Sequence, residues 1–69
     1  MVREFPLAPL ERIAKKAGAK RVSLSATKAL RDALLEYAYR VASEAVIVAR
    51  HAGRVTVKDK DIRLVVRRE

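Results

Sequence analysis

The sequence contains no cysteine and only one histidine among its 69 residues. A disulfide framework and a thiolate metal site are therefore excluded, and a single imidazole cannot form a histidine cluster. A chain of this length buries only a small core, so it needs some other source of stability. Oligomerisation is the source that remains, and no metal or other cofactor is expected.

Long apolar runs are also missing. The N-terminal stretch MVREFPLAPL lacks the continuous apolar segment of a signal peptide, and no stretch approaches the roughly 18 apolar residues of a membrane span. We therefore expect a cytoplasmic protein without a membrane partner. No carboxylate pair is placed by the pattern at a shared pocket, so neither an enzyme nor a small-molecule substrate is predicted.

Basic residues, in contrast, are abundant. Sixteen lysines and arginines face eight acidic residues, and the net charge is +8. Residues 1–31 hold eight basic and two acidic residues, 32–50 hold two and three, and 51–69 hold six and three. The positive charge therefore lies towards the two ends of the chain. Such a balance on a small protein indicates a polyanionic partner, and nucleic acid before a membrane surface.

Glycine and proline are scarce, and they delimit the expected helices. Pro9 suits the first turn of a helix over about Ala8–Ala17, and Gly18 suits its left-handed end. Ser23 can cap the next helix, which meets no glycine or proline from Leu24 to His51. That helix would be about 42 Å long at 1.5 Å per residue.

The segment after Gly53 is predicted to be a loop followed by a short helix. Arg54-Val55-Thr56-Val57 alternates and is β-branched, which favours a few residues of extended chain. Thr56 and Asp59 instead fit a capping box. A third helix then runs from about Lys58 to Arg67.

The long helix argues against a monomer. A compact globule of this length has a diameter of about 28 Å on the usual size scaling, which the helix exceeds by about half. Its second half, VASEAVIVARHA, is apolar on nearly all sides and needs cover on more than one of them. A second copy whose long helix crosses the first supplies that cover, so a homodimer is predicted.

Two longer motifs accompany this order of helices, PLAPLERIAKKAGAKRVS and ASEAVIVARHAGRVTVKDKDI. Together they closely resemble the archaeal histones, from about Phe5 to Arg68. The resemblance implies an all-α histone fold, in which a short helix, a long central helix and a short helix form an intertwined handshake dimer. Residues 1–69 would then be a single histone-fold domain.

The resemblance also implies a DNA-binding surface. Arg21 would enter the minor groove beside Thr56 of the partner subunit, and Arg12 would face the central minor groove. Histones in general wrap DNA through minor-groove arginines without base-specific contacts, and the resemblance implies the same here. Val55 stands where the family often has a lysine, which removes one phosphate contact. The implied DNA-binding residues are Arg12, Lys15, Lys20, Arg21, Ser23, Arg54, Thr56 and Lys58.

Two further roles follow from the resemblance. Arg54 would pair with Asp61 and clamp the second loop to the last helix. Val48, His51, Asp61 and Leu64 match the surface through which archaeal histone dimers join. Without the resemblance, Lys20 and Arg21 also fit solvated loop charges, and His51 also fits a helix-terminal cation or a packed core residue.

The predicted function is that of an archaeal histone. A homodimer would bind, bend and wrap double-stranded DNA largely without sequence specificity, and would join further dimers, or histone paralogues, to compact the chromosome. The protein would then be found at the nucleoid. One alternative is a histone-fold transcription-factor subunit that needs a different partner chain. A second alternative is a basic RNA-binding or ribosomal helical protein. RNA recognition usually relies on aromatic side chains that stack on bases, and this chain has only three aromatic residues, so this alternative is less favoured.

Overall fold

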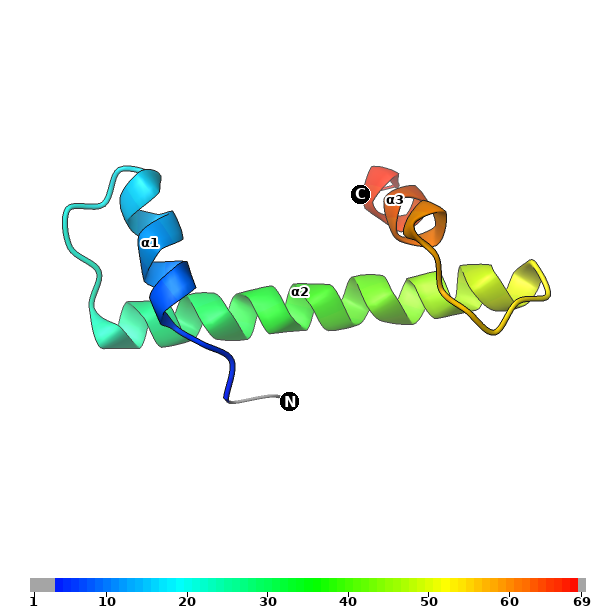
Figure 1. Ribbon diagram of the computed structural model, residues 1–69, viewed down its shortest axis with the longest axis horizontal. Helices are drawn as coiled ribbons and strands as arrows, with labels where there is room; N and C mark the ends of the chain where they lie inside the picture. The colour runs from blue at the N-terminus through cyan, green and yellow to red at the C-terminus, as the bar shows by residue number, and fades with distance from the viewer. Residues whose placement is uncertain (1–3, 69) are drawn as a thin grey trace. The chain divides into compact units, whose positions relative to one another are not determined.

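A computed structural model describes residues 4–68, and all regular secondary structure in that range is helical (Figure 1). The helices are α1 (Ala8–Lys16), α2 (Leu24–His51) and α3 (Asp59–Arg67). The prediction of a short, a long and a short helix is confirmed, with the bounds of α2 as expected and those of α1 and α3 within one residue. The predicted domain also includes residues 1–3 and 69, which lie outside the described range.

The ends of the helices follow from a few local residues. Pro9 lies in the first turn of α1, where the helix has no use for an amide hydrogen. Gly18 and Gly53 both have positive φ, 121° and 72°, a conformation that other residues adopt at a cost. Ser23 caps α2, because its Oγ accepts a hydrogen bond from the Ala26 amide at 3.1 Å.

The segment before α3 differs from both sequence-based expectations. It contains no strand, and the backbone bends at Val55 and Thr56 instead of extending. The residue that caps α3 is Lys58, whose amide donates to Asp61 Oδ2 at 2.8 Å. Thr56 and Asp59 do not form the cap, since Asp59 Oδ1 accepts from the neighbouring Lys60 amide at 2.9 Å. Asp61 stands three residues after Lys58, which is the spacing that a cap requires.

The chain divides into two compact units, Met1–Glu36 and Tyr37–Glu69, and α2 contributes to both. In the second unit, α3 packs on the second half of α2 through a small apolar core. Val41, Ala45 and Val65 are buried there, and the partly buried Val48 and Ile62 pack against them. Val41 and Ala45 are four residues apart and so lie on one face of α2. That face holds α3.

The first unit contains α1 and the start of α2. Leu10 of α1 is buried there, with 4% of its surface exposed. Thr27 of α2 is also buried, and its hydroxyl donates to the Ser23 carbonyl oxygen at 3.1 Å. This bond satisfies the one polar side chain that the unit buries among its described residues.

Much apolar surface stays exposed when one chain is taken alone. Only five apolar side chains are buried among the described residues. The apolar residues of α2 and α3 that remain open to solvent include Leu30, Leu34, Tyr37, Ile47, Leu64 and Val66. Such surface marks a site of association. Separately, no helix within residues 4–68 is long and apolar enough to span a membrane.

Candidate nucleic-acid interface

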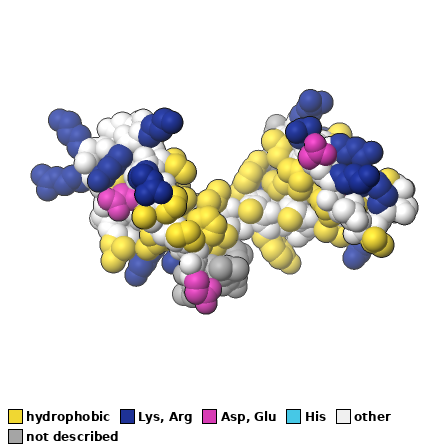
Figure 2. Space-filling model, viewed as in Figure 1, with side chains coloured by type: hydrophobic (Ala, Val, Ile, Leu, Met, Phe, Trp, Pro, Cys, Tyr) yellow, Lys and Arg dark blue, Asp and Glu magenta, His cyan; other side chains and the backbone are white. Residues whose placement is uncertain are grey.

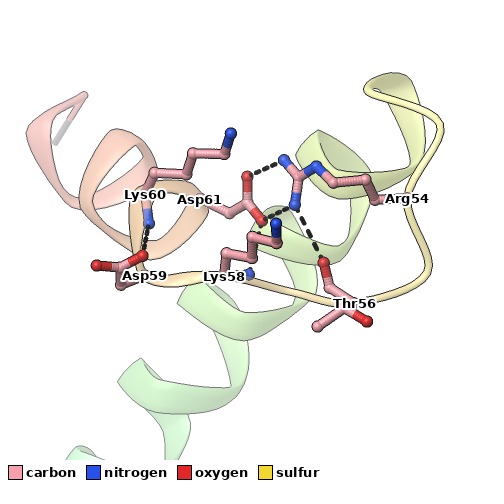
Figure 3. Close-up of polar contacts among 6 residues, drawn as sticks. All are labelled: Arg54, Thr56, Lys58, Asp59, Lys60 and Asp61. Carbon is pink, nitrogen blue, oxygen red and sulfur yellow. Dashed lines mark hydrogen bonds and ion pairs between the residues drawn. The ribbon is translucent and has the colours of Figure 1, made fainter.

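The loop between α2 and α3, called the second loop from here on, is fixed by a bidentate ion pair between Arg54 and Asp61 (Figure 3). Arg54 Nη2 donates to Asp61 Oδ1 at 2.7 Å, and Nη1 donates to Oδ2 at 2.9 Å. The same Nη1 also donates to the Thr56 carbonyl oxygen at 3.1 Å. One guanidinium therefore ties the middle of the loop to α3. This fork geometry suits arginine and not lysine, whose ammonium cannot form two parallel bonds to a carboxylate.

The ion pair is shielded from solvent, and it shifts the pKa of both groups. Asp61 is 2% exposed and the Arg54 side chain is 22% exposed. The hydrogen bonds from Arg54 and from the Lys58 amide hold the pKa of Asp61 well below its usual value, and the charge of Lys60 adds to this effect. Hydrogen bonding to Asp61 raises the pKa of Arg54. Both side chains are therefore charged in the folded protein at neutral pH.

The clamp leaves the outer side of the loop open. Thr56 and Lys58 are exposed, and Val55 is fully exposed at 102%. Arg54 itself is not free, because its guanidinium is occupied by Asp61 and by the Thr56 carbonyl. Three of the implied DNA-binding residues lie on this loop. Thr56 and Lys58 have the exposure that a DNA contact needs, and Arg54 holds the loop in shape.

The first loop presents a second cationic surface. Lys20 and Arg21 are exposed between α1 and α2. Ser23 follows them, and its hydroxyl is engaged in the cap of α2 and lies 3.3 Å from Ser25 Oγ. The helix N-terminus beside these cations adds a partial positive charge. Lys20 and Arg21 therefore have the exposure that an anion-binding role requires.

On α1, the implied contacts are exposed but differ in their surroundings. Arg12 is exposed to solvent. Lys15 is paired with Glu11 one helical turn away, at 3.2 Å. Both side chains of this pair are about half exposed, so the interaction is weak and easily exchanged for another anion.

The four residues implied in dimer joining differ in accessibility. Val48 is partly buried against the core, and Asp61 is buried in its ion pair. His51, the last residue of α2, and Leu64 on α3 are exposed. They line different surface hollows, His51 with Ile47 and Arg50, and Leu64 with residues of α3 and Arg54.

Sequence reasoning did not single out a cationic cluster on α3. Lys60, Arg63 and Arg67 line one hollow of this helix together with Leu64. Their i, i+3 and i+7 spacing is the signal that could have found them. Separately, no group of three potential metal ligands occurs among residues 4–68.

Comparisons with known proteins agree with this arrangement. Residues 3–66 match the model of the family described as histone-like transcription factor (CBF/NF-Y) and archaeal histone. One relative, named as a subunit of the archaeal histone HAN1 from Thermococcus zilligii, is 55% identical over 64 residues, which cover 93% of this chain and 96% of that protein. The chain belongs to the archaeal histone family.

A second relative supports the same membership. Probable archaeal histone 3 of Methanocaldococcus jannaschii is 48% identical over 64 residues, with 93% of this chain and 96% of that protein covered. The resemblance to archaeal histones is thereby confirmed over nearly the whole chain. The three helices are those of the histone fold, whose family arrangement is the handshake dimer, and archaeal histones are DNA-binding proteins of chromatin.

Proposed function

We propose that two copies of this chain form a handshake homodimer that binds, bends and wraps double-stranded DNA largely without sequence preference. The observation that carries the proposal is the Arg54–Asp61 clamp, with bonds of 2.7 and 2.9 Å, on a loop whose outer side is exposed. A loop held in one shape by internal bonds loses little freedom on binding, which favours affinity. The family membership gives this geometry its context.

The homodimer is supported by the apolar surface that one chain leaves open. The residues in question lie on α2 and α3, and Ile47 is 53% exposed while Leu64 is 46% exposed. Each apolar side chain buried by a partner would contribute about 1.5–3 kcal/mol. Folding and dimerisation are then one process, and the stability depends on protein concentration.

The DNA contacts would come from paired loops. In an antiparallel crossing of the two α2 helices, the first loop of one chain lies beside the second loop of the other. Arg21 would then enter the minor groove next to Thr56 of the partner subunit. Phosphates would be held by cationic side chains and by the residue that caps α2, namely Arg12, Lys15, Lys20, Lys58 and Ser23. Arg54 would contribute indirectly, because its ion pair with Asp61 fixes the shape of the second loop.

Further dimers would join through Val48, His51, Asp61 and Leu64, and the chromosome would be compacted by the resulting assembly at the nucleoid. Val48 and His51 are three residues apart and share a face of α2. Leu64 adds exposed apolar area from α3. Three of the four acceptor positions of Asp61 are already occupied, by Arg54 and the Lys58 amide. The apolar residues would therefore carry most of this contact.

Replacement of the first-loop arginine tests the DNA-binding proposal. Arg21→Ala should weaken binding of a short duplex by about tenfold or more, because a charged hydrogen-bonding group is lost from each paired loop. The melting temperature should be unchanged, since Arg21 is exposed. Lys28→Ala, an exposed cation on α2 outside the loops, is the matched control. Equal affinities for the parent and for Arg21→Ala would refute the paired-loop site.

A second candidate is a dimer with a different chain. The relative that is 55% identical is named as one subunit of a histone, which favours a partner of different sequence. Light scattering of the purified chain separates the two cases. A folded dimer formed by this chain alone supports the homodimer, whereas an unfolded or aggregated chain that is rescued by a second histone supports the heterodimer.

A further inference from the structure

A shallow groove on the surface of the second unit lies along α3, and Arg54 of the second loop is its one lining residue outside that helix. It has a volume of about 490 Å³ and is lined by Arg54, Lys60, Asp61, Arg63, Leu64 and Arg67. We call it the α3 groove, after the helix that provides five of these six residues. Its volume lies within the range of sites that hold a peptide side chain or a small ligand.

The phase of α3 places the groove on its outward face. Val65 is buried on the side that faces α2, and Ile62 packs against the same core. Asp61 is buried at the edge of the groove. Lys60 and Leu64 are one turn apart, and Arg67 follows at i+7, so the three lie in one stripe. Figure 2 shows lysine and arginine side chains gathered over this unit, with apolar surface beside them.

The charge of the groove is not balanced within the described chain. Its only carboxylate, Asp61, is already neutralised by Arg54. Arg63 has an exposed partner, Asp59, at 3.1 Å, and a pair so exposed holds little energy. Neither Lys60 nor Arg67 forms an ion pair with a carboxylate among residues 4–68. The charge of Lys60 acts on Asp61, but that carboxylate is already paired with Arg54. The groove therefore offers two uncompensated cations, and binding of an anionic partner would relieve their repulsion.

The apolar residue in the stripe decides which anionic partner fits. Leu64 is 46% exposed and stands between Lys60 and Arg67 along the helix. A phosphate backbone gains little from an apolar side chain at this point, whereas a peptide can place a leucine or isoleucine there and carboxylates on either side. Seven residues of helix separate the two cations by about 10 Å, which about three residues of extended peptide span.

We propose that the α3 groove binds an acidic peptide segment of a partner protein, with carboxylates at Lys60 and Arg67 and an apolar side chain on Leu64. This goes beyond DNA binding, since the groove uses the outward face of α3. Asp61 and Leu64 also belong to the surface proposed to join dimers. A bound peptide would consequently compete with dimer joining and would favour single dimers.

The test uses the full chain without DNA and a short labelled peptide in which glutamates flank a central leucine. Fluorescence anisotropy measures its affinity for the parent and for Lys60→Gln/Arg67→Gln. The groove variant should bind at least about tenfold more weakly, because both charged contacts are lost. The matched control is Lys16→Gln/Lys28→Gln, which removes the same charge from exposed positions of the first unit. The control should bind within about twofold of the parent, and both variants should melt like it.

Further measurements separate this proposal from its alternatives. A peptide with serine in place of leucine should bind several times more weakly, and equal binding of the two peptides would overturn the apolar contact. Equal losses for the groove and control variants would mean that only net charge matters, which also overturns the proposal.

A short DNA duplex should bind the groove variant and the control variant alike. A selective loss of duplex binding by the groove variant would make the groove a phosphate site instead. If the parent protein failed to bind DNA but still bound the peptide, the proposed function would be refuted and this inference would stand.

Discussion

Val55 is the position where a single charge most directly tests how the second loop faces DNA. Its side chain is 102% exposed, so a substitution removes no packing within the chain. The backbone on either side is held, because the Arg54 guanidinium bonds to Asp61 and to the Thr56 carbonyl oxygen. In Val55→Lys the new ammonium would extend from a loop of unchanged shape, beside Thr56 and Lys58.

The expected effect follows from counterion release. Each phosphate that a protein neutralises adds about 0.9 to the slope of log affinity against log salt. A homodimer carries two such loops, so Val55→Lys should steepen the slope by about 1.8. Between about 50 and 200 mM salt, the affinity of the variant should therefore fall by roughly a further twelvefold compared with the parent. At the low-salt end the variant should bind more tightly than the parent.

The assay is fluorescence anisotropy with a labelled duplex that accommodates one dimer, repeated at several salt concentrations. Val55→Gln is the control, since it adds a polar side chain without charge, and its slope should equal that of the parent. The melting temperatures of all three proteins should agree. A slope for Val55→Lys that matches Val55→Gln would show that this loop does not face phosphates, and the paired-loop arrangement would have to be abandoned.

The clamp and the joining surface make two further predictions. Because the pKa of Asp61 is lowered in the fold, the stability it contributes is complete above its ordinary value of 3.8 and is lost as pH falls further. Asp61→Asn should therefore melt at a lower temperature than the parent at neutral pH, and the gap should shrink on acidification to about pH 2 at fixed protein concentration; a constant gap in circular dichroism melts would contradict this. Val48→Lys should place like charges across a two-fold contact at a cost of several kcal/mol. It should also lower the melting temperature, because Val48 packs in part against the α2–α3 core, and the dimers that remain folded should bind short DNA but assemble poorly on long DNA. Unchanged sedimentation on long DNA would mean that Val48 lies outside the joining surface.

The sequence predicted the helices well because their limits depend on local chemistry. Pro9, Gly18, Ser23 and Gly53 act within a few residues of their own positions, and each lies at a helix end as expected. The loop before α3 was harder to predict. Alternation of β-branched residues favoured an extended segment there, but an extended strand needs a partner strand for its backbone hydrogen bonds. Arg54 supplies a different partner for the Thr56 carbonyl, so the chain bends.

The candidate site was predictable to the extent that it resides in exposed loop residues. Lys20, Arg21 and Thr56 can be recognised from charge and position, and the structure finds them accessible. The cationic cluster on α3 could not be predicted in the same way, since Lys60 and Arg67 look like ordinary solvated charges in the sequence. Their significance depends on which face of α3 is buried, and that is settled by the packing of α3 against α2.

Asp61 links several of these features through one carboxylate. Its Oδ2 accepts from both Arg54 and the Lys58 amide, and its Oδ1 accepts from Arg54. The same group thus starts α3, fixes the loop and balances one cation of the α3 groove. A glutamate would place its carboxylate one methylene further from the backbone, where it could not hold the Lys58 amide and the guanidinium fork with the same geometry. An arginine-to-lysine change at position 54 would keep the charge but lose the second prong and the bond to Thr56. Charge alone therefore does not define the loop, and the residue types at 54 and 61 are fixed by geometry.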